Sequence, residues 1–227
     1  MNKIKLSIVI PVWNQEELIC RSIKSVPDRE DIEVIVVNDG STDRTKEVIE
    51  EHREEFLSNF TYLELEENQG VANALNLGLK NIKGDYYMAL GSDDYLITSE
   101  FNKFVDTQLD GTDMVYFNLR VNDGSLFRLN EETYTIFVGS TKAYRTEFIK
   151  DITYPRGKRA LEDITFDTHV RILNPTIKFT DMTIKHYNWP RENSLTYLAA
   201  NDKIEQNLLG RPYAKNKKKQ ITKTTNK

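Results

Sequence analysis

The first ninety residues alternate between continuous apolar runs and stretches in which apolar residues recur every three to four positions. Four apolar runs predict strands, at residues 4–13, 32–39, 60–66 and 85–90. Helical spacing separates them, around residues 18–26, 48–56 and 71–82. Strands that alternate with helices in this way form a parallel sheet with right-handed crossovers. The third run alternates less perfectly than the others, which favours a strand near the sheet edge.

The second half of the chain has a less regular pattern. Residues 113–121 predict a strand, and the segment that follows, through residue 138, is typical of hairpin material. Residues 140–149 and 162–173 are predicted to be helical. We therefore expect one α/β domain over residues 1–213, with a nucleotide-binding half at 1–95 and a mixed α/β acceptor half at 96–213.

Charge is unevenly distributed along the 227 residues. The net charge is −4, but the last fourteen residues hold six lysines and no acid, so the remainder carries about −10. A body this acidic is a poor match for a duplex nucleic acid, whose binding proteins show a basic face. The basic tail, 214–227, is expected to be a disordered, solvated end. The alternative is attachment to an anionic surface, either lipid or a polyanionic acceptor.

Several function classes lack their sequence signals. No apolar run approaches the ~20 residues of a membrane span, and the start of the chain does not resemble a signal peptide. The single cysteine, Cys20, excludes an intramolecular disulfide and a cysteine-cluster zinc site. These features predict a cytoplasmic protein. Neither GxxxxGK[ST] nor GxGxxG is present, which argues against kinase-like and dinucleotide-binding readings.

Polar and glycine residues follow each of the four predicted strands. In open α/β sheets ligands bind outside the carboxyl ends of the strands, so this edge is the expected site. The segments there are Pro11–Asn14, Asn38–Ser41, Asn68–Gly70 and Gly91–Asp94. The last contains two adjacent carboxylates, Asp93 and Asp94, whose repulsion must be compensated by a cation or a hydrogen-bond network. The sequence leaves two readings, a polar turn or a metal site.

Four segments in order resemble the family 2 glycosyltransferases of the GT-A fold. They are "SIVIPVWN", "VIVVNDGSTDRT", "NQGVANALNLGLKNIKGDYYMALGSDD" and "LEDITFDTHVRI", and the resemblance runs from Ser7 to about Ser194. It implies a Rossmann-like, mostly parallel sheet with helices on both faces. It also implies an inverting enzyme that moves a sugar from a nucleotide-sugar, usually a UDP-sugar, to an acceptor hydroxyl with Mn²⁺ or Mg²⁺.

The resemblance assigns donor-binding roles to residues at the strand ends. Asp39 would accept a hydrogen bond from the nucleotide base, which suits an acceptor-only carboxylate facing the N–H of uracil. Its alternative role is that of a helix-capping acid. Pro11 and Val12 would form the floor under the base, although Pro11 could equally be a simple strand terminator. The remaining expected donor contacts are Asn14, Asn68, Gly70 and Ser92.

The metal site implied by the resemblance departs from the family pattern. The family has Asp-X-Asp where this chain has Gly91-Ser92-Asp93. Side chains of an extended chain alternate in direction, so Asp93 is expected to be the metal ligand and Asp94 to hold the loop or a neighbour. His186 is a candidate second ligand. Lys185 and Arg191 are candidate partners of the phosphates.

The Glu-Asp motif of the family falls at Glu162 and Asp163. The resemblance implies that Asp163 deprotonates the acceptor hydroxyl, while Phe166, Val170 and Leu173 anchor its helix in the core. The alternative is a pair of acids stabilising a helix N-terminus.

The acceptor stays open: a glycan, a lipid-linked sugar, a protein or a modified nucleobase. Two other functions also stay open. One is a nucleotide-sugar-binding module without transfer activity, which Gly91 makes plausible. The other is a nucleotidyltransferase on a similar sheet, although that would require a basic glycine-rich loop where "WNQEEL" is acidic.

Overall fold

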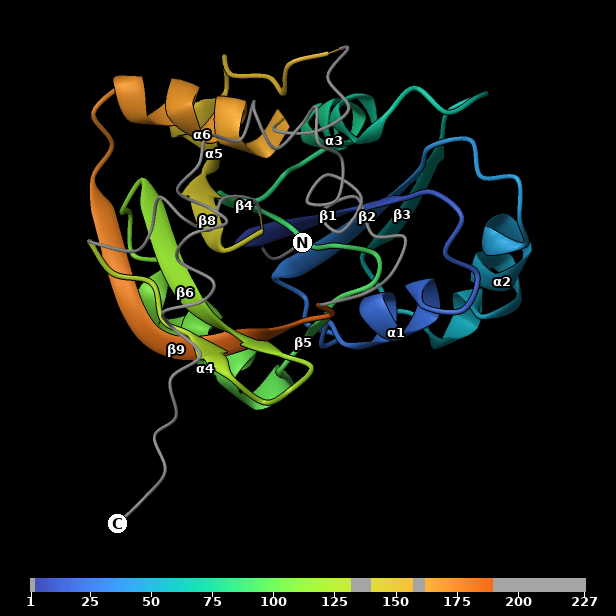
Figure 1. Cartoon of the computed structure of the whole chain (residues 1–227), viewed down its shortest axis with the longest axis horizontal. Helices are drawn as coiled ribbons and strands as arrows, with labels where there is room; N and C mark the ends of the chain where they lie inside the picture. The colour runs from blue at the N-terminus through green and yellow to red at the C-terminus, as the bar shows by residue number, and fades with distance from the viewer. Residues whose placement is uncertain (1–2, 132–139, 157–161, 190–227) are drawn as a thin grey trace. The chain divides into compact units, whose positions relative to one another are not determined.

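The computed structural model describes residues 3–131, 140–156 and 162–189 (Figure 1). Arg191, the basic tail and the proposed boundary at residue 213 lie outside the described residues. The described elements, in chain order, are β1 (Leu6–Val12), α1 (Ile19–Lys24), β2 (Ile32–Asn38), α2 (Thr45–Glu51), a 3₁₀ turn η1 (Arg53–Glu55), β3 (Phe60–Glu64), α3 (Val71–Leu79), β4 (Tyr86–Ala89), β5 (Tyr95–Leu96), α4 (Thr98–Gln108), β6 (Met114–Val121), β7 (Leu126–Phe127), β8 (Lys142–Arg145), α5 (Thr146–Ile149), α6 (Glu162–Ile172) and β9 (Ile177–Tyr187).

The strands form a single nine-stranded sheet. Its order is β3-β2-β1-β4-β8-β6-β9-β5, and β7 pairs with β6 alongside this path. The first four strands are parallel, and β3 lies at the edge, which confirms both predictions for the first ninety residues. Strand β8 runs antiparallel to β4 and β6, whereas β6 and β9 are parallel. The two halves of the chain therefore share one hydrogen-bonded sheet.

Helices cover both faces of the sheet, and each face has its own apolar core. Helices α1, α2 and α4 contribute to one core, with Ile8 and Ile10 of β1; α3, α5 and α6 contribute to the other, with Val9 (Figure 1). Neighbouring residues of β1 thus point to opposite faces, and both faces are buried. This explains why the first strands are continuously apolar in the sequence. No helix in the described part of the chain is long and apolar enough to cross a membrane.

The prediction of a helix over residues 140–149 was wrong for its first half. Residues Lys142–Arg145 form β8, and only Thr146–Ile149 are helical. The alternation of a strand is present, because Tyr144 packs in one core and Ala143 in the other. Lys142, a charged residue at a buried position, made this alternation hard to recognise in the sequence. Leu173 was also expected in the core, but α6 ends at Ile172 and Leu173 is exposed.

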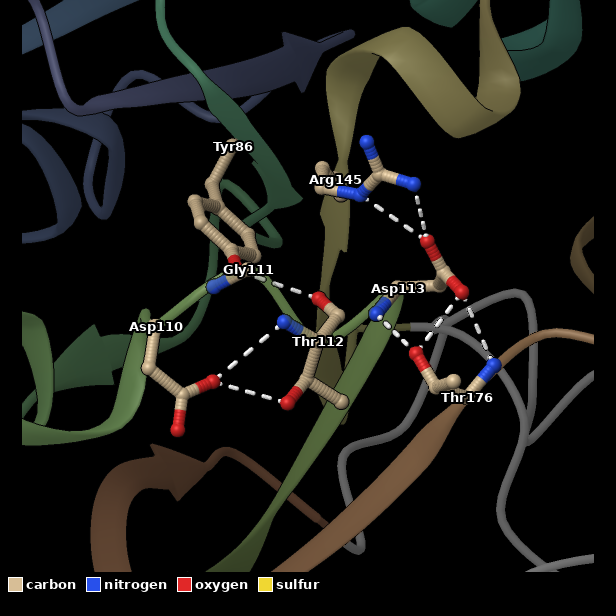
Figure 2. Close-up of polar contacts among 7 residues, drawn as sticks. All are labelled: Tyr86, Asp110, Gly111, Thr112, Asp113, Arg145 and Thr176. Atoms are coloured by element: carbon tan, nitrogen blue, oxygen red, sulfur yellow. Dashed lines mark hydrogen bonds and ion pairs between the residues drawn. The ribbon is translucent and has the colours of Figure 1, made fainter.

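The strands β6, β8 and β9 are joined by a polar cluster at the end of the sheet opposite the predicted site (Figure 2). The buried carboxylate of Asp113 accepts hydrogen bonds from Arg145 Nε at 2.9 Å and from Thr176 N and Oγ1 at 2.8 and 2.7 Å. Nearby, Tyr86 Oη accepts from Gly111 N at 2.7 Å and donates to Thr112 O at 3.0 Å. This cluster fixes how β6, β8 and β9 join the parallel strands.

Candidate active site

An open pocket of about 620 Å³ lies where β1, β2 and β3 end. It is lined by Trp13, Gly40, Ser41, Thr42, Lys46, Glu64, Leu65, Glu66, Glu67 and Asn68. Trp13 is 50% exposed, which is unusual for so large an apolar side chain. It had no role in the sequence analysis, although an aromatic residue directly after a strand at the ligand edge was a usable signal. Of the expected donor contacts that the structure describes, only Asn68 lines this pocket.

Asp39 is buried beside this pocket and connects two strand ends. Its Oδ1 accepts a hydrogen bond from Gln69 N at 2.8 Å, and its Oδ2 accepts one from Gly70 N at 2.9 Å. Burial raises the pKa of Asp39, while the two backbone hydrogen bonds act in the opposite direction. A carboxylate oxygen has two lone pairs, so each retains acceptor capacity for a base N–H.

Gly40 allows the close approach of the β2 and β3 loops. Its φ is +62°, and a Cβ at this position would lie 2.4 Å from the carbonyl carbon of Glu67. Only glycine therefore fits between Asp39 and the pocket wall.

Asn14 joins the β1 and β2 loops. Its Oδ1 accepts from Thr42 N at 2.8 Å and from Asp43 N at 3.4 Å, and its backbone N donates to Ser41 Oγ at 3.0 Å. Asn14 thus positions Ser41 and Thr42, which line the pocket. Pro11 is half-buried and Val12 is buried at the end of β1.

Hydrogen bonds to side chains of α1 and of the residue that follows it hold the acidic loop, residues 91–94. Ser22 Oγ donates to Gly91 O at 3.1 Å, and Arg21 Nη2 donates to Asp93 O at 2.6 Å. Just beyond the loop, Leu96 N donates to Ser25 Oγ at 2.9 Å. Three polar side chains of one short helical segment therefore fix the backbone of this loop. Ser92 in its centre is buried.

Asp94 is buried and faces β9. Its Oδ2 accepts from Lys185 Nζ at 2.8 Å, and its Oδ1 accepts from Asn188 N at 2.9 Å. Lys185 also donates to Ser140 Oγ. Asp94 thus holds the loop to a neighbouring element, as expected. The alternation argument behind that expectation was wrong, because the loop is not extended: Asp94 N donates to Gly91 O at 3.1 Å and closes a turn. The expected phosphate role of Lys185 does not fit this geometry, because its ammonium is buried and already paired.

His186 lies on the neighbouring face of β9, directly opposite Tyr95 of β5. The two rings stack with centroids 4.5 Å apart, and the guanidinium of Arg21 lies 4.9 Å from the Tyr95 ring centroid. His186 Nδ1 is buried without a hydrogen-bond partner. Burial lowers the pKa of His186, and the charge of Arg21 lowers it further, so the imidazole is neutral at pH 7.

The donor set at the acidic loop suits a metal shared with a substrate. Asp93 offers a carboxylate two residues before Tyr95 of β5, and Tyr95 pairs with His186 of β9. The Nδ1 atom of the neutral His186 is buried without a hydrogen-bond partner, so it is a suitable metal ligand. The described residues contain no group of three or more histidine, cysteine or acidic side chains that could hold a metal ion. A metal here would therefore need further oxygen ligands from a diphosphate or water.

Asp163 lies in the first turn of α6 and is half-buried. Its Oδ1 accepts a hydrogen bond from Ile164 N at 2.7 Å. Burial raises the pKa of Asp163, which brings the carboxylate closer to the range of a general base at neutral pH. Phe166 and Val170, in the following turns, are fully buried and anchor the helix as expected.

The start of β8 brings α6 to the same sheet edge as the acidic loop. Strand β8 pairs antiparallel with β4, so Lys142 lies towards the carboxyl end of β4, where Gly91 follows. Ser140, two residues earlier, contacts the Lys185 that pairs with Asp94. Lys142 in turn binds Asp167 of α6 at 2.8 Å. This path connects the acidic loop to the helix of Asp163.

This arrangement of strand ends, acidic loop and Glu-Asp helix agrees with a family-level match. The model of the family described as "Glycosyl transferase family 2" matches residues 7–180. The chain belongs to this family. The match covers the strand ends, the acidic loop and α6, which confirms the resemblance seen in the sequence.

Similar proteins include enzymes named for teichoic-acid synthesis. The chain is 30% identical over 197 residues to the "Teichoic acid poly(glycerol phosphate) polymerase" of Staphylococcus epidermidis, covering 75% of this chain and 27% of that one. It is 28% identical over 183 residues to the "Poly(ribitol-phosphate) beta-N-acetylglucosaminyltransferase TarS" of Staphylococcus aureus, covering 71% and 31%. The chain thus spans less than a third of the length of these curated relatives.

Solved structures share the fold. TarS 1–349 of S. aureus in complex with UDP-GlcNAc superposes with a TM-score of 0.71, at 24% identity over 85% of this chain and 61% of that chain. The mannosyltransferase PcManGT of Pyrobaculum calidifontis, in complex with GDP-Man and Mn²⁺, gives a TM-score of 0.68 at 18% identity, over 87% and 61%. The predicted GT-A fold, a mixed Rossmann-like α/β sheet, is confirmed.

Proposed function

We propose that this chain is the catalytic domain of an inverting glycosyltransferase that moves a sugar from a UDP-sugar to an acceptor hydroxyl. One observation carries the proposal. The pocket at the ends of β1–β3, the acidic loop after β4 and the α6 helix of Asp163 are connected along one edge of one sheet. The nucleotide, the diphosphate and the acceptor of such a reaction need three neighbouring subsites in this order.

The base of the nucleotide is assigned to the pocket beside Trp13. The exposed indole of Trp13 offers a face on which the base can stack. The buried carboxylate of Asp39 belongs to the residue directly before Gly40 of the pocket wall. The pocket wall contains Glu66 and Glu67 beside a Glu64 that pairs with Lys46 at 2.7 Å, and the remaining negative charge disfavours a diphosphate there. The diphosphate is therefore directed away from this wall and towards the acidic loop. A UDP-sugar as donor is supported by the TarS complex with UDP-GlcNAc.

Mn²⁺ or Mg²⁺ is the proposed cofactor, held by Asp93 and His186. A divalent ion supplies charge neutralisation for the leaving diphosphate when it is bound. The mannosyltransferase complex with Mn²⁺ supports metal use within this fold. Asp94 is paired with Lys185 and Gly91 stands at the first motif position, so Asp93 is the carboxylate of this loop assigned to the metal.

Asp163 is the proposed general base. Its carboxylate takes the proton of the acceptor hydroxyl while the hydroxyl oxygen forms a bond to the anomeric carbon and the bond to the UDP oxygen breaks. Attack from the face opposite the leaving group inverts the anomeric configuration. The raised pKa of Asp163 suits proton transfer near neutral pH.

A hydroxyl of a polyol-phosphate polymer is the proposed acceptor. The names of the S. epidermidis polymerase and of S. aureus TarS both include such polymers. The cytoplasmic location stays a prediction from the sequence.

The test measures UDP release from UDP-GlcNAc and UDP-glucose with poly(ribitol phosphate), with poly(glycerol phosphate) and with water. We expect Mn²⁺-dependent release that rises with a polymer, together with a glycosylated product by mass spectrometry. UDP binding by calorimetry without release under any condition would instead identify a nucleotide-sugar-binding module. Release with water alone would overturn the acceptor assignment.

A further inference from the structure

A cluster of charged side chains lies buried between β8 and α6, one helical turn from Asp163. The ammonium of Lys142 is completely buried, and its Nζ donates to Asp167 Oδ1 at 2.8 Å. The other oxygen of Asp167, Oδ2, accepts from Arg171 Nε at 2.7 Å. Tyr144 Oη donates to the same Oδ1 at 3.2 Å. Every one of these contacts joins α6 to the sheet or braces it internally.

Aromatic rings enclose the Lys142 ammonium on its remaining sides. It lies 4.8 Å from the ring centroid of Tyr116 and 5.9 Å from that of Tyr144. Arg171 also donates to Tyr116 Oη. A buried ammonium loses the solvation of water, and its pKa is lowered by that burial despite the attraction of Asp167. Its retention in a core therefore requires a compensating role in position or charge.

A second carboxylate, that of Asp163, lies one helical turn before this cluster. Lys142 and Arg171 are cations, and Asp167 is one anion. Asp163 precedes Asp167 by four residues, so the two carboxylates lie on the same side of α6. The charge of Lys142 favours the ionised form of Asp163, and that of Asp167 disfavours it.

We propose that Lys142 is a positioning residue for Asp163: it fixes α6 to β8 and supplies a buried positive charge one helical turn from Asp163. The proposal rests on the proposed function, because it deepens the role of Asp163 as general base. In this arrangement the ammonium favours the ionised form of Asp163 and opposes the effect of burial.

The charged and titratable groups around Asp163 come from four described elements and one loop. They are Lys142 and Tyr144 of β8, Asp167 and Arg171 of α6, Tyr116 of β6, Tyr87 of β4, and Tyr154 in the loop after α5. Tyr87, Tyr144 and Tyr154 are neutral at physiological pH, since burial raises the pKa of each. Among the described charged side chains, Lys142 and Asp167 act on Asp163 with opposite signs.

The test compares two substitutions with opposite electrostatic signs in the full chain. Lys142→Met removes the positive charge at nearly constant length, so we expect the pKa of Asp163 and the acid limb of the turnover profile to move to higher pH. Asp167→Asn removes a neighbouring negative charge, so both should move to lower pH. Loss of packing alone would displace the two variants in the same direction.

The pKa of Asp163 is read from the ¹³C signal of its carboxyl group, assigned with Asp163→Asn. Lys150→Met, at an exposed lysine that pairs with Glu147, is the control and should move neither readout. An unmoved Asp163 pKa in both variants, or movement in the same direction, would overturn the proposal. If the pKa of Asp163 moves in opposite directions in the two variants while the pH profile of turnover stays unchanged, the coupling of Lys142 to Asp163 is upheld. Asp163 is then not the general base. Should Lys142→Met fail to fold, Asp167→Asn alone still tests the sign.

Discussion

Asp94 and Lys185 form a buried ion pair 2.8 Å long, with side chains only 3% and 1% exposed. The pair joins the acidic loop to a strand that begins about eighty residues later in the chain. Breaking a buried pair by removing one partner leaves the other charge uncompensated.

Asp94→Ala should therefore lower the free energy of unfolding by about 3–5 kcal/mol. Asp93→Ala, its neighbour, should change stability little and abolish metal-dependent transfer. Denaturant unfolding of the two variants, beside turnover with Mn²⁺, separates a structural role from a ligand role. The double variant Asp94→Leu/Lys185→Met should recover part of the lost stability. Equal stability losses at positions 93 and 94 would contradict this assignment.

Gly91→Ala should distort the acidic loop. A Cβ at this position would lie 2.9 Å from Asp94 Oδ2 and 3.0 Å from Asp93 Oδ1, so both carboxylates must move. We expect a lower melting temperature and weaker Mn²⁺ binding by calorimetry in the presence of UDP. For the same reason, Gly91→Asp should fail to strengthen metal binding although it recreates Asp-X-Asp. Tighter Mn²⁺ binding by Gly91→Asp at unchanged stability would show that the loop tolerates a side chain.

Trp13→Ala should weaken UDP binding about tenfold or more, because stacking of a base on an aromatic ring contributes ~1–3 kcal/mol. Trp13→Phe should retain most of the affinity, since it keeps a ring at this position. Leu126→Ala, another exposed apolar residue outside the pocket, is the matched control. Calorimetric titration with UDP measures all three. An affinity unaffected by Trp13→Ala would place the base elsewhere.

Asp163→Asn should reduce turnover by the ~10²–10⁴-fold typical of losing a general base. UDP affinity should persist, because this residue is expected to contact the acceptor and not the nucleotide. Both quantities are measured on one preparation, by UDP release and by calorimetry. A joint loss of affinity and turnover would indicate that Asp163 supports the donor site or the fold.

Asp113 should make stability depend on pH at the opposite end of the sheet. Burial acts to raise its pKa, but hydrogen bonds from Thr176 and Arg145 prevail, so the pKa lies below its usual value. A carboxyl group with a depressed folded-state pKa contributes stability that is present above the unfolded pKa of about 3.9 and is lost as pH falls through the folded pKa. Asp113→Asn should therefore be destabilised at pH 7 and converge towards the parent at acid pH. Parallel unfolding curves across this range would contradict the prediction.

The parallel half of the fold was predictable because its signals are local. Strands β1, β2 and β4 are apolar on both faces, and their ends carry the polar residues that mark the site. The second half was less accessible. Strand β8 carries Lys142, and β9 contains Lys185 and His186, so charged residues interrupt the apolar pattern. Helix α4 and strand β9 were not predicted.

The position of a candidate residue was predictable where it follows a strand and not where it depends on distant pairing. Asp39 and Asp93 lie after strands as expected, and Asp163 lies in the first turn of a helix as expected, while their roles stay predictions. The stack of Arg21, Tyr95 and His186 is different, because it requires β5 to pair with β9 across about ninety residues. No periodicity in the sequence encodes that register.

The pairing of β5 with β9 also has a consequence for the order in which the protein can mature during synthesis. Strands β1–β4 can pair with one another as soon as residue 89 has left the ribosome, since all their partners lie upstream. The acidic loop cannot complete its contacts at that stage. Asp94 accepts hydrogen bonds from Lys185 and Asn188, and these two residues are made last among the described residues. A nascent chain stopped before residue 177 should therefore contain the folded parallel strands and an acidic loop that is held by α1 but not yet by β9. Catalytic competence would then arise late, after the donor side has formed.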